Sequence, residues 1–152
     1  MITFIKLFLL NAVILTGLVF AEFQGALSLI VRSDASYISI LIMSLYISMT
    51  VFIGILAYKS DVVNREGKDK LLKQSEAAYF TADHMFTLGL LGTIIGLCIA
   101  TSDSLVDNLS VTEIVAGLKT GLNVSFYTTL CGIVFSLLLQ LQLLVLKKDL
   151  EE

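Results

Sequence analysis

The stretch that decides the fold runs from Met85 to Ser102, reads MFTLGLLGTIIGLCIATS and contains no Asp, Glu, Lys or Arg. A bilayer core about 30 Å thick needs about 20 apolar residues in a helix, so this stretch predicts a membrane-spanning segment. Three other uncharged stretches approach the same length: 7–21, 35–58 and 120–146. We therefore predict an all-α integral membrane protein with four transmembrane helices.

The composition of the 152-residue chain agrees with this prediction. Hydrophobic residues make up 57% and charged residues 15%, whereas soluble domains average about 25% charged. A net charge of −3 without a long basic run argues against a nucleic-acid partner. We expect one membrane domain over 1–152, with helices at about 3–21, 36–58, 68–101 and 111–146.

The basic residues predict the orientation of these helices. Of the ten Lys and Arg residues, only Arg32 and Lys119 lie in the links 22–34 and 103–119. The other eight precede the first span, follow the fourth, or lie between the second and third. Because cytoplasmic loops are enriched in Lys and Arg, we expect both termini and the segment 59–84 in the cytoplasm.

Local signals predict where some helices begin. Ser110 followed by Glu113 is typical of a capping box at the start of the last helix. Gly67 is a plausible break before the third. The first apolar segment follows Lys6 as a signal peptide would, but no small-residue cleavage site stands out at its end, so we expect a retained helix.

Small residues recur at helical spacing in the third and fourth spans. Such faces let membrane helices approach closely, either as plain helix packing or in subunit assembly. The residues assigned to helix packing are Gly89, Gly92, Gly96, Gly121, Ser125 and Gly132.

Threonines on these faces point to a polar path. Measured from residues 102 and 120 as outer ends, Thr93 and Thr129 each lie ~13 Å deep. A hydroxyl can donate and accept a hydrogen bond, so a ring of such groups from several copies could line a path for ions. The alternative is that each hydroxyl bonds to the carbonyl four residues earlier in its own helix.

Two motifs resemble those of the MotA/TolQ/ExbB family. The segment 88–97, LGLLGTIIGL, is similar to the family's third-helix pattern Gly-x-x-Gly-Thr-x-x-Gly, and 125–132, SFYTTLCG, resembles the fourth-helix motif of flagellar stator A subunits. They occur in the family's order, and the similarity covers 85–146. The four-helix layout resembles the flagellar type rather than the three-helix TolQ/ExbB type.

The resemblance implies a homopentamer around a single-span B-type partner in a bacterial inner membrane. An Asp in the partner's helix takes up and releases the ion, and ion flow drives rotation. By matching, Thr93 and Thr129 would be the pore threonines, with Thr128 beside them. The transported ion would be H⁺ or Na⁺, and no cofactor is expected.

The sequence also departs from the family pattern. It contains no proline, and Thr120 stands about where one is usual. Asn123 or Val124 replaces a carboxylate of the TolQ/ExbB proteins. The segment 59–84 is far shorter than the rotor-binding domain of flagellar proteins, which implies a different biological task.

Two other functions fit the composition. A small four-helix secondary transporter of the multidrug type places one Glu in its first helix, where Glu22 is the candidate. A holin-like or accessory assembly protein would need small-residue packing alone. The lone His84 lacks ligand partners, and Cys98 and Cys131 lie in apolar stretches, so neither an enzyme nor a metal site is expected.

Overall fold

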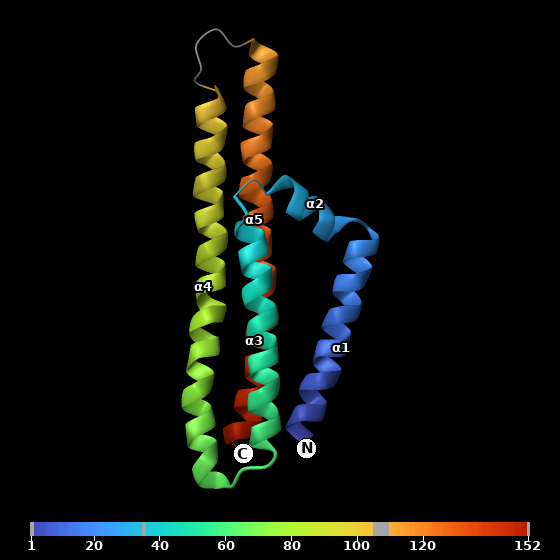
Figure 1. Cartoon of the computed structure of the whole chain (residues 1–152), viewed down its shortest axis with the longest axis vertical. Helices are drawn as coiled ribbons and strands as arrows, with labels where there is room; N and C mark the ends of the chain where they lie inside the picture. The colour runs from blue at the N-terminus through green and yellow to red at the C-terminus, as the bar shows by residue number, and fades with distance from the viewer. Residues whose placement is uncertain (1, 35, 105–109, 152) are drawn as a thin grey trace.

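A computed structural model describes residues 2–34, 36–104 and 110–151, and every regular element within them is a helix (Figure 1). The helices are α1 (Ile2–Phe23), α2 (Ala26–Ser33), α3 (Ile38–Ser60), α4 (Arg65–Ser104) and α5 (Val111–Glu151). Of these, α1, α3, α4 and α5 are long and apolar enough to cross a membrane. The predictions of an all-α fold and of four candidate membrane spans are therefore confirmed.

Of the two predicted helix starts, the structure confirms the one of α5 and differs at the one of α4. The capping box at α5 is confirmed: Ser110 N donates to Glu113 Oε2 at 2.8 Å, and Glu113 N donates to Ser110 Oγ at 3.4 Å. The predicted break at Gly67 is wrong, because α4 already begins at Arg65 and Gly67 N donates to the Asn64 carbonyl at 2.9 Å within its first turn. The link 22–34 contains the separate helix α2.

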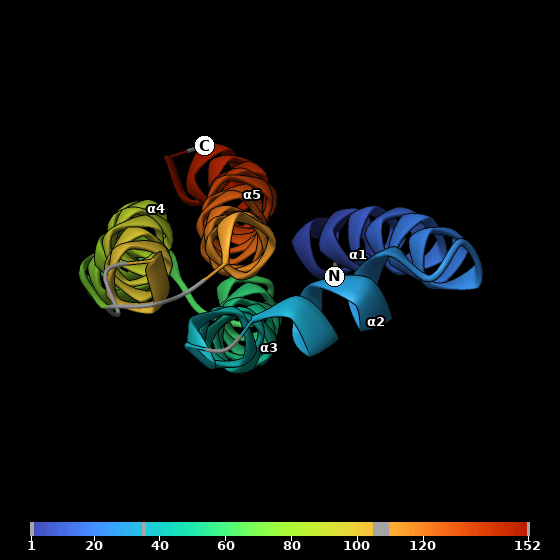
Figure 2. The ribbon, with the colours of Figure 1, turned by 90° about the horizontal axis from the view of Figure 1, so that it is seen from above.

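The architecture is a long antiparallel hairpin of α4 and α5 with shorter helices packed on one part of it (Figure 1). Seen from above, α3 lies against both α4 and α5, and α1 lies beside α3 and α5 on the side away from α4 (Figure 2). Helix α2 crosses between the far end of α1 and the start of α3 (Figure 1). Helix α1 begins and α5 ends at the same end of the molecule.

The apolar helix α3 lies beside the polar half of α4, an arrangement that the sequence analysis did not anticipate. Only residues 61–64 connect α3 to α4. Because this connection is short, α4 must begin next to the end of α3 and run back along it. Residues 65–84, which were expected to extend beyond the spans, therefore lie alongside α3, and the hairpin continues past the start of α3 (Figure 1).

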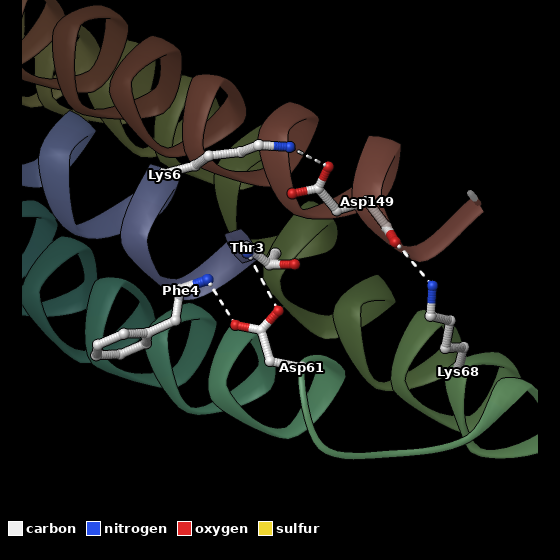
Figure 3. Close-up of polar contacts among 6 residues, drawn as sticks. All are labelled: Thr3, Phe4, Lys6, Asp61, Lys68 and Asp149. Atoms are coloured by element: carbon white, nitrogen blue, oxygen red, sulfur yellow. Dashed lines mark hydrogen bonds and ion pairs between the residues drawn. The ribbon is translucent and has the colours of Figure 1, made fainter. Parts of the chain in front are cut away.

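Polar contacts join four helices at the end where the chain begins and ends (Figure 3). Lys6 Nζ of α1 forms an ion pair with Asp149 Oδ1 of α5 at 2.7 Å, and Lys68 Nζ of α4 donates to the Asp149 carbonyl at 3.1 Å. The Asp61 carboxylate, next to α3, accepts from the backbone N–H groups of Thr3 and Phe4. These bonds fix the start of α1, whose buried residues are Thr3 and Leu7.

Candidate functional site

Glycines allow α4 and α5 to pack backbone to backbone. A Cβ atom built on Gly132 would lie 2.8 Å from Gly89 Cα, and one built on Gly96 would lie 2.7 Å from the carbonyl oxygen of Gly121. Real Cβ atoms essentially never approach other atoms so closely. The two backbones can therefore keep this separation only without side chains at these positions.

All six residues assigned to helix packing lie in this contact within one chain. Gly92 faces the Thr128 side chain, and Ser125 Oγ donates to the Thr93 carbonyl at 3.0 Å. The sequence left open whether these faces serve packing or assembly. The structure uses them to hold α4 against α5, so they are not free for a second subunit.

Thr93 and Thr129 meet at the edge of this contact. Their Oγ1 atoms form a hydrogen bond with each other, in which either atom can be the donor. Both side chains are half-buried, so the pair is held by the hairpin and still reachable from outside it. The equal depth inferred from the sequence agrees with this pairing.

Backbone carbonyls surround the hydroxyl pair. Thr129 Oγ1 lies 2.9 Å from the Ser125 carbonyl and 3.4 Å from the Gly89 carbonyl. Thr93 Oγ1 lies 3.3 Å from each of the same two carbonyls. The sequence alone left open whether each hydroxyl bonds to the carbonyl four residues earlier in its own helix. The structure contains these bonds and also the contact between the two hydroxyls.

The number of hydroxyl protons limits which of these bonds exist together. Each hydroxyl has one proton and two acceptor lone pairs. If Thr93 donates its proton to Thr129, Thr129 donates its own proton to a backbone carbonyl. If Thr129 donates to Thr93 instead, Thr93 donates to a carbonyl, and both protons are again used. Either way, lone pairs remain on the hydroxyls for a third group that donates a proton or carries positive charge. The pair therefore suits a water, a protonated acid or a cation.

A groove gives access to the pair from one side. It has a volume of ≈ 410 Å³ and runs between α4 and α5. Its polar lining comes from Thr93, Ser125 and Thr129. Its walls are apolar: Leu90, Leu97, Leu122, Phe126, Leu130 and Ile133. A group that enters this groove exchanges water for hydrocarbon walls and a small cluster of oxygen atoms.

Thr128 belongs to the packing contact and not to the groove. Its side chain is fully buried, and its Oγ1 donates to the Val124 carbonyl at 2.8 Å or the Ser125 carbonyl at 3.2 Å. A Cβ on Gly92 would lie 2.5 Å from Thr128 Oγ1. The adjacent threonines Thr128 and Thr129 thus point in different directions, because successive helical residues differ by about 100°.

A second polar cluster, missed by the sequence analysis, joins α5 to α3. Gln142 Nε2 donates to Tyr46 Oη at 3.1 Å and to Thr50 Oγ1 at 3.3 Å, and the Gln142 side chain is fully buried. The signal available in the sequence was a glutamine inside an apolar run, since buried amides in membrane helices require partners. This cluster fixes how α3 sits on the hairpin.

Comparisons with protein-family models, with curated proteins and with solved structures found no match to this chain.

Proposed function

We propose that this chain is an ion-conducting subunit of a membrane complex driven by an ion gradient. The observation that carries the proposal is the contact between the hydroxyls of Thr93 and Thr129 beside an open apolar groove. Several copies, with five expected from the resemblance, surround a single-span partner. The partner helix supplies the carboxylate that takes up and releases the ion.

The hydroxyl pair supports this role through its effect on a carboxylate. A carboxylate that enters the apolar groove loses water, which raises its pKa and favours the neutral form. The hydroxyl that bonds to a backbone carbonyl can give up that bond and donate its proton to the ionised carboxylate instead, which offsets part of the penalty by about 1.5–3 kcal/mol for a bond to a charged group. The pair thereby helps the group to alternate between neutral and charged forms.

We assign the ion-binding carboxylate to another chain because the segments that carry Thr93 and Thr129 have no ionisable Asp or Glu of their own. Residues 85–102 and 120–146 contain no Asp, Glu, Lys or Arg. An ionisable group inside a membrane is costly and usually functional, so its absence from these segments favours a partner as its source.

The proposed assembly uses surfaces other than the small-residue faces, which hold the hairpin together. Exposed apolar side chains along α4 and α5 offer such surfaces, among them Leu91, Ile94, Leu118 and Val134. Native mass spectrometry of the detergent-extracted complex tests the stoichiometry: five copies with a bound single-span protein are expected. A stable dimer without a partner would contradict the proposal.

The transporter alternative is not favoured by the position of Glu22. Its Oε2 accepts a hydrogen bond from the backbone N–H of Ser28 at 3.0 Å, at the start of α2. The carboxylate is exposed and ties the α1–α2 link together. This structural role of the Glu22 carboxylate in the α1–α2 link disfavours the transporter alternative.

A further inference from the structure

A separate apolar cavity lies between α1 and α3. It has a volume of ≈ 400 Å³ and shares no lining residue with the groove at the hydroxyl pair. Most of its lining consists of apolar side chains from α1, α3 and α5, among them Leu15, Leu18, Met43, Ile47, Val51 and Phe135. The cavity is therefore a second candidate site for a ligand.

The polar residues of this lining offer little to a polar ligand. They are Asn11, Tyr46 and Thr50. Tyr46 Oη and Thr50 Oγ1 both accept hydrogen bonds from Gln142 Nε2, so these two hydroxyls are directed toward α5. The surface that the cavity presents is therefore almost entirely apolar.

Contacts close the cavity at both of its ends. Near the start of α1, the rings of Phe4 and Tyr58 have centroids 6.1 Å apart, and Leu7 is fully buried. At the other end Leu27 of α2 lines the cavity, where α2 crosses from α1 to the start of α3 (Figure 1). A transmembrane helix, about 10–12 Å across with its side chains, therefore cannot run through the cavity unless α1 and α3 separate.

The cavity is open at its side. Leu15, Ile47 and Val51 line it, yet they are 62%, 63% and 59% exposed. The stretches 7–21, 35–58 and 120–146, which provide most of the lining, contain no Asp, Glu, Lys or Arg. Their helices are long and apolar enough to cross a membrane. In a bilayer, the hydrocarbon chains of lipids therefore surround this opening.

We propose that an acyl chain of a membrane lipid binds in this cavity and holds α1 against α3. Of the described residues of α1, only Thr3 and Leu7 are buried, so the rest of the helix has little support from the protein. Apolar cavities do not hold water, and an empty one leaves its lining without contacts on one side. A thin, flexible chain that enters from the side supplies these contacts. The site is independent of the proposed ion path.

Native mass spectrometry of the protein extracted in a mild detergent tests the site. The variants Leu15→Trp and Ile47→Trp each place an indole ring in the cavity, from different helices. Val13→Trp is the matched control, because Val13 is 71% exposed on α1 and does not line the cavity. We expect lipid on the wild type and on the control. Both cavity variants should retain about tenfold less, since the indole ring fills the space of the chain.

Thermal unfolding provides the second readout. After lipid is removed with excess detergent, added phosphatidylethanolamine should raise the Tm of the wild type and of Val13→Trp, because a ligand that binds only the folded state stabilises it. The Tm of Leu15→Trp and of Ile47→Trp should not respond to the lipid.

Equal lipid retention in the cavity variants and the control would overturn the inference, because the lipid would then bind elsewhere. A wild type that retains its subunits but no lipid would overturn it as well. Loss of a protein subunit instead of lipid from both cavity variants would show that another protein covers this position. The two variants alter different helices, so a folding defect in one leaves the other to decide.

Discussion

Thr93 and Thr129, 36 positions apart in the chain, share a hydrogen bond between their side-chain hydroxyls at the edge of the α4–α5 contact. The glycines that flank them bring the two backbones together, and the groove leaves one side of the pair open. The close packing of the two helices thus places two hydroxyl groups at an accessible position in the apolar part of the hairpin.

The first prediction concerns the hairpin contact. Gly96→Leu should destabilise the protein by about 1–3 kcal/mol or more, because the added side chain meets the backbone of α5. The control is Gly54→Ala in α3, where a Cβ would meet nothing within 4 Å. Thermal unfolding in detergent measures both. Equal stability of Gly96→Leu and the wild type would contradict the observed packing.

The second prediction concerns pH and the start of α1. Burial raises the pKa of Asp61, but hydrogen bonds, including those from the backbone N–H groups of Phe4 and Thr3 and from the Thr3 side chain, together outweigh it and lower the pKa from 3.8 to about 2. Because the folded pKa is the lower one, the carboxylate stabilises the docked α1 above pH 3.8, and this stabilisation is lost as the pH falls toward 2.

Hydrogen exchange of residues 2–7, corrected for intrinsic rates, measures this effect between pH 5 and pH 2. Protection should fall with pH in the wild type and be low at every pH in Asp61→Asn. The same pH dependence in both proteins would show that another group controls the docking of α1.

The third prediction concerns the ion. We expect protons, because a carboxylate and water need only a hydrogen-bonded chain, whereas sodium requires several oxygen atoms at once. A protonophore should abolish the activity of the complex, and replacement of sodium by potassium should leave it unchanged. Activity that follows the sodium gradient and survives the protonophore would contradict this expectation.

The sequence predicts the helices and the hydroxyl pair because both follow from local rules. Uncharged runs of span length mark the helices, and counting 1.5 Å per residue places Thr93 and Thr129 at one depth. The separate roles of Thr128 and Thr129 also follow from helix rotation, although they become evident only when Thr128 is seen against Gly92.

The position of α3 along the hairpin was not predicted. A prediction from hydropathy places every apolar segment at the same depth in the bilayer. In the structure, the connection at 61–64 is so short that the polar start of α4 must run back beside α3. The contacts of Gln142 with Tyr46 and Thr50 then fix that register. These are long-range contacts, and no local pattern in the sequence specifies them.

The role of the hydroxyl pair in the ion path is tested by the ion-driven activity of complexes that carry Thr93→Ala or Thr129→Ala. Both variants should assemble, since losing one hydrogen bond costs only about 0.5–1.5 kcal/mol, and both should lose most of their activity, while Thr93→Ser and Thr129→Ser should retain it. Thr120→Ala is the matched control, because this exposed hydroxyl bonds to the Ala116 carbonyl at 3.0 Å outside the groove. Full activity in both assembled alanine variants would contradict the assignment of the hydroxyl pair to the ion path.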